Sequence, residues 1–443
     1  MLKKGMTAWL VLPLAAISLA GCGNMPETKE QPAGAVPASG NAPAELVFFS
    51  NSADSQESFN ERFGDAIRNK FSNYTIKYIK KEKGSLLPDL IASGQPIDIY
   101  WESIGGFADG LIGFDMQYDM TDLAKKYKVN LESFEPTIMD ALKQLSDGKL
   151  YGLPVFNNSM VLYYNKDIFD KFGVPYPKDG MNWDEALELG KKLTRSEGGV
   201  QYFGLGVTQL HILRMNPFSL PLVDPKTDKA TIGNDNWKKL YSSVFINPAQ
   251  DQGYRAKIEE NKNKLPSETY DPFTKTRVMA MSGAITSLPS IRAEELSAFR
   301  WDMVAMPTFK ELPGVGPQAY PTYFSVTKQS KYKEQAMEVI RFLASEAYQT
   351  EAAKKGVFMP VLKSDAVKKA FGQENAQFKG KNIGALFYNK YAPIPEKSKY
   401  NGVAQSMFEK VIGDLALGKT DMNTAFRTVE EEVNKAVEAE KKK

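Results

Sequence analysis

The sequence predicts an α/β protein with two lobes, and three observations support this. Strands and helices alternate along the first folded stretch, which is typical of a mainly parallel sheet. The 443 residues correspond to roughly two or three domains at about 150 residues each. Beyond a Pro-, Ala- and Gly-rich segment at 23–44, no stretch has the composition of a linker, and no long internal repeat is visible. Two lobes joined by crossing strands would explain a long chain without a linker.

The alternation is clearest between residues 46 and 101. We expect strands at 46–50, 74–79 and 97–101 and helices at 59–71 and 86–93. The first helix is indicated by apolar residues that recur every four positions from Phe59 to Phe71 and so form one stripe. In such sheets ligands bind beyond the carboxyl ends of the strands. Those ends carry Asn51, Ser52, Trp101 and Glu102.

The composition excludes several classes of function. Lys and Arg number 56 against 53 Asp and Glu, without a cluster of five or more basic residues, so nucleic acid is not expected as a partner. A single Cys and a single His exclude a disulfide scaffold and a Cys/His metal cage. We therefore expect neither a metal nor a cofactor. The 42% of apolar residues is enough for a real core.

The N-terminus resembles a bacterial lipoprotein signal. Lys3 and Lys4 precede an apolar stretch at 9–19, and Cys22 directly follows Leu-Ala-Gly. The resemblance implies a signal peptide at 1–21, a diacylated Cys22, a disordered tether at 22–44 and anchoring on the extracytoplasmic face of the cell membrane. The alternative is a plain signal peptide with an incidental cysteine.

One phosphate-loop pattern, GDLALGKT at 413–420, occurs in the wrong context. Such a loop needs a strand before it. Here apolar residues recur every four positions from Val403 to Leu415, so the first glycine should lie inside a helix. Gly418 then reads as a C-terminal cap, and Thr420 or Asp421 as the N-cap of the last helix.

Other catalytic patterns are weak. Ser330 opens an SxxK match, but without its companion motifs, and we interpret it as an N-cap. His211 lacks an orienting partner in sequence and reads as a polar contact. The segment 224–228 lacks the glycine of a calcium loop and reads as a turn. A glycosidase with two carboxylates stays open, since acids far apart in sequence can converge in a fold.

Two segments carry a family resemblance. Residues 147–154 read DGKLYGLP and residues 161–169 read VLYYNKDIF, which resembles the signature of family 1 extracellular solute-binding proteins. These are the ligand receptors of bacterial ABC importers, many of them for sugars. Further matches follow in the family's order at 182–185, 277–283, 301–307, 356–360 and 418–420. Unlike many maltodextrin-binding members, this chain has no tryptophan after Gly283, which argues against a long maltodextrin ligand.

The resemblance implies a periplasmic-binding-protein-like fold in which two α/β lobes are joined by crossover hinge strands. One lobe would hold 45–156 plus 322–365, and the other 157–321 plus 366–443. The crossovers would lie near 156–158 and 320–323. Lobes joined in this way can close on a ligand, so part of the site should be made of hinge residues.

A sugar cleft combines planar polar groups for hydroxyls with aromatic rings for C–H faces. The candidate ligand-binding residues are Asn51, Ser52, Trp101, Glu102, Asn157, Asn158, Tyr320, Tyr323, Tyr388 and Tyr391. For most other aromatic residues packing is the better interpretation, and we assign Trp183, Trp237 and Trp301 to it.

We therefore predict a non-enzymatic receptor that binds a small saccharide and delivers it to the membrane subunits of an ABC permease. The alternatives are a surface-tethered carbohydrate hydrolase and a binding protein for a non-sugar solute. A scaffold or sensory lipoprotein is a further alternative, ranked after the hydrolase.

Overall fold

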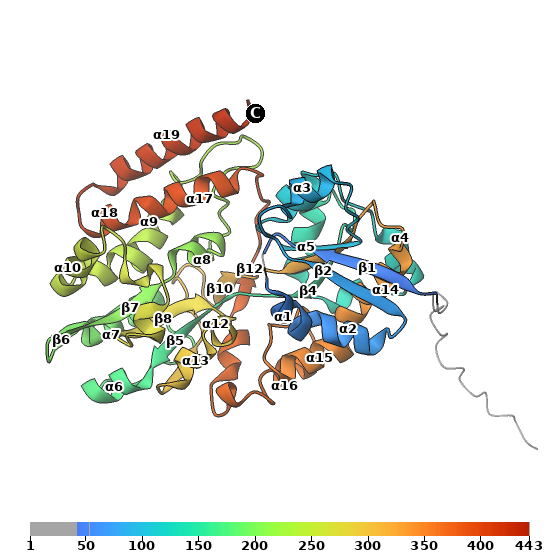
Figure 1. Cartoon of the computed structure of the whole chain (residues 1–443). Helices are drawn as coiled ribbons and strands as arrows, with labels where there is room; N and C mark the ends of the chain where they lie inside the picture. The colour runs from blue at the N-terminus through green and yellow to red at the C-terminus, as the bar shows by residue number, and fades with distance from the viewer. Residues whose placement is uncertain (1–41, 53, 443) are drawn as a thin grey trace, which may run out of the picture. The chain divides into compact units, whose positions relative to one another are not determined.

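The computed structural model describes residues 42–52 and 54–442 (Figure 1). In these residues the strands form two five-stranded sheets and one two-stranded pair. We call the part around the sheet that contains β1 the first lobe, and the part around the sheet that contains β5 the second lobe. The predicted signal peptide, Cys22 and the tether up to residue 41 lie outside the described residues.

The first-lobe sheet has the order β2-β1-β3-β11-β4. Its strands are β1 (Ala44–Phe49), β2 (Tyr74–Ile79), β3 (Ile99–Ser103), β4 (Leu153–Phe156) and β11 (Thr322–Val326). Strand β1 pairs in parallel with β2 and β3, as the alternation predicts. Strand β11 arrives from much later in the chain and lies antiparallel between β3 and β4. The sheet is therefore completed by a segment that is distant in sequence.

Helices cover this sheet. Those that follow its strands along the chain are α1 (Gln56–Phe59), α2 (Asp65–Lys70), α3 (Leu87–Ala92), α4 (Thr121–Lys126), α5 (Pro136–Leu145), α14 (Lys333–Leu343), α15 (Glu346–Lys354) and α16 (Asp365–Ala370). Short turns are the π-helical η1 (Asn60–Gly64) and η2 (Ala108–Ile112) and the 3-10 helix η3 (Leu131–Ser133). Helices α1, η1 and α2 run on from one another, so the predicted helix at 59–71 is confirmed with a π-helical turn inside it. Its apolar stripe is buried at Phe59, Phe63 and Ile67.

The second-lobe sheet has the order β6-β7-β8-β5-β9. Its strands are β5 (Met160–Asn165), β6 (Arg195–Glu197), β7 (Val200–Val207), β8 (Met279–Ile285) and β9 (Trp301–Val304), and the separate pair is β10 (Val315–Gln318) with β12 (Lys390–Ala392). The helices are α6 (Lys166–Phe172), α7 (Trp183–Leu193), α8 (Gln209–Arg214), α9 (Asp235–Tyr241), α10 (Gln252–Glu260), α11 (Asp271–Thr274), α12 (Leu288–Ile291), α13 (Ala293–Ser297), α17 (Asn401–Lys410), α18 (Ile412–Ala416) and α19 (Met422–Glu440). Short turns are η4 (Ser242–Ile246), η5 (Pro248–Gln250), η6 (Pro266–Glu268), η7 (Ala376–Phe378) and η8 (Ile383–Phe387). Helix α17 packs against α8 and α19 (Figure 1).

Two connections between the sheets lie side by side. The chain passes from β4 to β5 through 157–159 and from β10 to β11 through 319–321. The N–H of Asn158 donates to the carbonyl of Tyr320 at 3.2 Å, and the N–H of Tyr320 donates back to the carbonyl of Asn158 at 2.7 Å. A third passage follows α16, which packs on α15, and ends at η8, which contacts β9. Two of the segments that join the lobes are thus linked to each other by backbone hydrogen bonds.

Several smaller sequence predictions can be compared directly. The phosphate-loop pattern lies in a helical context, since Gly413 is inside α18, Gly418 has φ 68° and Asp421 caps α19. The N-cap prediction for Ser330 is wrong, because α14 starts at Lys333 with Tyr332 before it. Ser330 instead donates its hydroxyl to Asp98. The packing prediction for Trp183, Trp237 and Trp301 is confirmed, since all three are buried.

Asp98 is a buried carboxylate that fixes the start of β3. Its Oδ2 accepts the N–H of Val47 in β1 at 3.0 Å, and its Oδ1 accepts the hydroxyl of Ser330 at 2.6 Å. Asp98→Ala should lower the free energy of unfolding of the first lobe by about 3 kcal/mol, because a buried N–H and a hydroxyl both lose a charged acceptor. Urea denaturation followed by tryptophan fluorescence measures this change. Ser330→Ala, which removes one of the two bonds, should cost about 1 kcal/mol. An unchanged denaturation midpoint for Asp98→Ala would show that the carboxylate is not a structural tie.

Candidate functional site

Two cavities meet between the lobes. The larger, which we call the main cavity, has a volume of about 500 Å³, and the smaller, the side cavity, about 240 Å³. Both are lined by Glu102, Ser103 and Tyr320, so they are neighbouring arms that meet at these residues. Each takes residues from both lobes, as expected for a site that lobe closure would tighten.

The end of β3 brings two predicted residues to the junction. Trp101 is 1% exposed, and its ring stacks on Phe324 of β11 with centroids 5.5 Å apart and planes 8° apart. Its Nε1–H is buried and donates to no acceptor among the described residues. Trp101 therefore lines the main cavity as part of its buried wall, and it presents little ring surface to a ligand.

Glu102, the next residue on β3, is 6% exposed and lines both cavities. Its Oε1 accepts the N–H of Ser103 at 2.8 Å and the Ser103 hydroxyl at 3.2 Å. Burial raises the pKa of the Glu102 carboxyl, and the two bonds from Ser103 oppose that rise. This carboxyl is thus a hydrogen-bond acceptor in a poorly solvated position.

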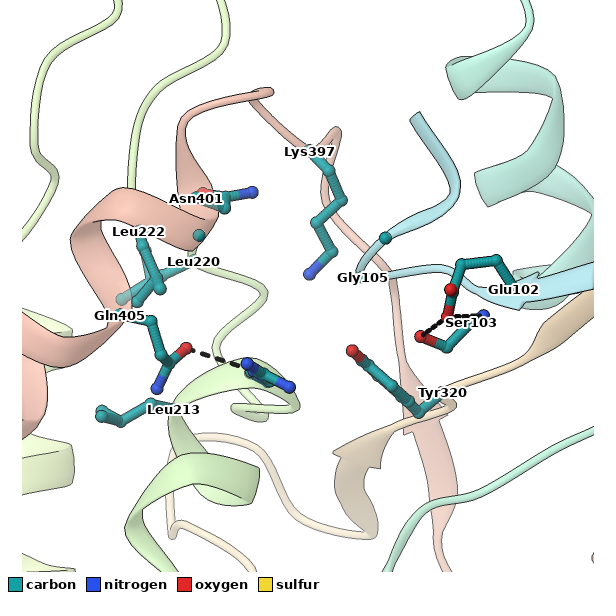
Figure 2. A pocket seen from close by; sticks show the side chains of 13 residues that line it. Glu102, Ser103, Gly105, Leu213, Leu220, Leu222, Tyr320, Lys397, Asn401 and Gln405 are labelled. Atoms are coloured by element: carbon teal, nitrogen blue, oxygen red, sulfur yellow. Dashed lines mark hydrogen bonds between the residues drawn. The ribbon is translucent and has the colours of Figure 1, made fainter. Parts of the chain in front are cut away.

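Two glycines in the loop after β3, Gly105 and Gly106, allow Tyr320 to lie close to this loop beside Glu102. A Cβ on Gly105 would stand 2.0 Å from the Tyr320 hydroxyl, and one on Gly106 would stand 3.2 Å from the carboxyl carbon of Glu102. The two glycines therefore allow a close approach that any side chain at Gly105 would block. Figure 2 shows the Tyr320 ring projecting into the space beside Gly105.

Asn158 and Tyr320 come from the paired connections. Asn158 lines the main cavity, and its Oδ1 accepts the hydroxyl of Thr286 at 2.9 Å. Its amide group is therefore oriented by the second lobe. Asn157 is buried instead: its Oδ1 accepts the N–H of Tyr320 at 2.9 Å and its Nδ2 donates to the Tyr391 hydroxyl at 3.2 Å. It positions the connections and stays outside both cavity linings.

Five of the ten candidate residues line a cavity: Ser52, Trp101, Glu102, Asn158 and Tyr320. The others lie outside both linings: Asn51, Asn157, Tyr323, Tyr388 and Tyr391. Tyr323 is fully buried and donates its hydroxyl to the carbonyl of Ile138 at 2.7 Å, whereas Tyr388 is 55% exposed. The side chain of Asn51 donates to the Tyr100 hydroxyl at 3.1 Å. Tyr320 is thus the tyrosine among the candidates that faces the cavities.

Arg62 lines the main cavity and has no counterpart among the sequence candidates. Its guanidinium lies 4.4 Å from the ring centroid of Phe156 and 5.8 Å from that of Trp101, and it pairs with Asp54 at 3.4 Å. Burial lowers the pKa of Arg62, and Asp54 opposes this. The residue sits on the π-helical turn beside Phe63, so the apolar stripe alone gave no reason to single it out.

The side cavity adds four polar residues, from α8, from α17 and from the segment before α17, that the sequence analysis did not single out. Arg214, Lys397, Asn401 and Gln405 line it. Figure 2 shows the Lys397 side chain reaching down into the space between Gln405 and Tyr320. Burial lowers the pKa of Lys397 to about 8, and the neighbouring Arg214 adds to this. The prediction that nearby His211 makes a polar contact is confirmed, because its Nδ1 lies within hydrogen-bond distance of the Thr208 and Tyr270 hydroxyls.

Two features bear on other classes of site. Within 42–52 and 54–442, no group of three His, Cys, Asp or Glu side chains is placed to hold a metal ion. In the same residues, every helix is too short or too polar to cross a membrane.

Comparison with known proteins gives a family match over residues 50–350, to the model described as bacterial extracellular solute-binding protein. A putative binding protein of Brucella abortus (strain 2308) is 27% identical over 234 residues, which cover 50% of this chain and 53% of that protein. The chain thus aligns with about half the length of this relative. The sn-glycerol-3-phosphate-binding periplasmic protein UgpB of Brucella melitensis is 24% identical, over 71% of this chain and 73% of that protein.

Solved structures share the fold at low identity. The ABC substrate-binding protein Lmo0181 of Listeria monocytogenes, in complex with cycloalternan, superposes with a TM-score of 0.64 at 19% identity, covering 89% of this chain and 98% of that one. The two-lobe α/β fold that the sequence predicts is therefore confirmed. Because the family model spans more than half of the sequence, this chain belongs to the bacterial extracellular solute-binding protein family.

Proposed function

We propose that the protein is an extracytoplasmic receptor of an ABC importer that binds a small saccharide between its lobes and delivers it to a membrane permease. The observation that carries this is the main cavity, which takes aromatic and polar walls from both lobes. Its volume of about 500 Å³ is in the range of small-molecule sites. The family match and the Listeria ABC substrate-binding protein support the assignment.

The chemistry at the junction suits a pyranose. Tyr320 offers the available aromatic ring, and Glu102 offers a carboxylate oxygen that accepts from hydroxyls. Asn158, whose Oδ1 already accepts the Thr286 hydroxyl, offers its Nδ2 as a donor. Ser52, whose hydroxyl donates to Asp54 at 2.8 Å, adds a polar edge on the first lobe. In this proposal Tyr320 takes the stacking role that the sequence suggested for Trp101, and Trp101 shapes the wall behind it.

The paired connections at Asn158 and Tyr320 form the hinge in this proposal. The lobes would then comprise 45–156 plus 322–365 and 157–321 plus 366–443, except that α16, which packs on α15, would belong with the first lobe. Because the hinge residues themselves line the cavity, ligand contact and lobe closure would be coupled.

The protein is proposed to act without catalysis. The carboxylates that line the main cavity are Asp54, Glu61 and Glu102, and Asp54 is paired with Arg62. A carbohydrate hydrolase is separated from a receptor by the fate of the ligand: a receptor returns it unchanged after long incubation. Appearance of cleavage products at a rate above the blank would favour the hydrolase.

Ligand should stabilise the folded protein. A saccharide at 100 times its dissociation constant should add about 2.7 kcal/mol to the free energy of unfolding, because it binds only the folded form. Thermal denaturation of residues 45–443 with a panel of mono- and oligosaccharides, polyols and amino acids measures this. If only polyols or amino acids raise the melting temperature, the proposal that the ligand is a saccharide is wrong, while the receptor function stands. A panel without any shift would remove its main support.

Glu102 and Trp101 should respond to mutation in opposite ways. Glu102→Gln should weaken saccharide binding by about 1 to 3 kcal/mol through a lost acceptor. It should leave unliganded stability at pH 7 unchanged or higher, because a carboxyl whose pKa is raised by burial costs stability once it ionises. Trp101→Ala should lower unliganded stability by about 3 to 5 kcal/mol, as a buried ring does. Calorimetry and urea denaturation separate the two effects. Equal loss of stability in both variants would contradict the assignment of Glu102 to the ligand.

We further propose that Cys22 is diacylated and anchors the protein to the membrane through the segment up to residue 44. Cys22→Ser should release the protein into the soluble fraction while saccharide affinity stays the same, since two acyl chains supply stable anchoring. Detergent-phase partitioning of the exported protein measures the first effect and a thermal shift the second. Unchanged partitioning of the variant would show that the lipoprotein interpretation is wrong.

A further inference from the structure

The side cavity holds two cations that come from separate elements. Arg214 ends α8, and Lys397 lies in the segment between β12 and α17. Both are partly buried and both line the same cavity of about 240 Å³. Among the described residues, neither has a carboxylate within ion-pair distance. Two cations therefore face one small space, and neither forms an ion pair with Glu102, the carboxylate in its lining.

Arg214 is held in place by a chain of hydrogen bonds. Its Nε donates to the Oε1 of Gln405 at 3.4 Å, and the Nε2 of Gln405 donates to the carboxylate of Glu409. Glu409 thus orients Gln405 and does not pair with Arg214 itself. Because Nε is used in this way, the two terminal nitrogens of the guanidinium remain for a planar acceptor.

The carboxylate at the rim of the side cavity uses its Oε1 for bonds from Ser103 and pairs with neither cation of this cavity. Glu102 accepts both the N–H and the hydroxyl of Ser103, and the cation that acts on it is Lys81. Lys397 makes no hydrogen bond or ion pair with another described residue, and its ammonium projects into the space that Figure 2 shows.

The two cations disfavour each other in this arrangement. Burial and Arg214 both disfavour the charged form of Lys397, whose pKa falls to about 8. An anion placed between the two would relieve both effects, since it would pair with each cation and replace lost solvation. The hydroxyl groups of a neutral ligand would not reduce the repulsion between Arg214 and Lys397.

We propose that the ligand carries an anionic group, a carboxylate or a phosphate, that Arg214 and Lys397 bind in the side cavity while its hydroxyl-bearing body occupies the junction at Glu102 and Tyr320. This rests on the proposed receptor function and narrows its ligand to acidic saccharides or sugar phosphates. In this proposal the Arg214 guanidinium donates to two oxygens of the anion, and the Lys397 ammonium, from the segment between β12 and α17, donates to the same anion.

Matched pairs of probes test this by calorimetry and thermal shift. Trigalacturonate is compared with its methyl ester, and glucose 6-phosphate with glucose, so that charge changes while the body is kept. Arg214→Gln and Lys397→Gln should each weaken binding of the charged member at least tenfold. Lys397→Gln should also raise the unliganded melting temperature, because it removes an opposed charge. Lys229→Gln, at an exposed lysine outside both cavities, is the matched control and should change neither.

The two charged probes distinguish a carboxylate from a phosphate ligand, and preference for either over its neutral partner supports the inference. Binding of a neutral saccharide with no preference for the charged member would overturn it and leave the receptor function standing. Charged-probe binding that both variants preserve would also overturn it. A complete lack of response to neutral and charged probes would count against the receptor function and the inference together.

Discussion

The reciprocal backbone bonds between Asn158 and Tyr320 are the constraint on which the rest of the site depends. They join two connections that are far apart in sequence, and the buried amide of Asn157 strengthens them by bonding to Tyr320 and to Tyr391. Because three segments are fixed at one point, Tyr320 is held where both cavities open. In the proposed hinge function, this arrangement would let the lobes move while the residues at the centre keep a fixed position.

From that point the two cavities differ in character. The main cavity has an aromatic wall behind it, in which Trp101 packs on both Phe324 and Phe156, and Arg62 lies over the rings of Trp101 and Phe156. The side cavity combines three leucines with donors from α8, α17 and the segment before α17. A ligand that spans the junction would therefore meet aromatic rings and the Arg62–Asp54 pair at one end, and the cations Arg214 and Lys397 at the other.

The local elements of the fold could be predicted from the sequence, because the stripe from Phe59 and the strand at 74–79 have clear periods. The phosphate-loop pattern was rejected for the right reason, since periodicity placed Gly413 in a helix. Ser330 was misassigned because a hydroxyl before a helix can serve either its first turn or a buried carboxylate, and Asp98 is remote in sequence. Trp101 was expected to face a ligand, but its burial depends on the register that sets it opposite Phe324, which no local pattern reveals. Arg62, Arg214 and Lys397 were missed for the same reason: each cavity is assembled from segments that only the tertiary structure brings together.

The position of β11 between β3 and β4 has a consequence for how the chain acquires its structure. During synthesis β3 and β4 emerge long before Thr322–Val326. The edges of β3 and β4 that pair with β11 therefore stay without hydrogen-bond partners until all strands of the second-lobe sheet have been made. Pairings of such long sequence separation form slowly. The unfinished chain is therefore exposed to mispairing for most of its synthesis, and the first-lobe sheet can be completed only when nearly three quarters of the chain is available.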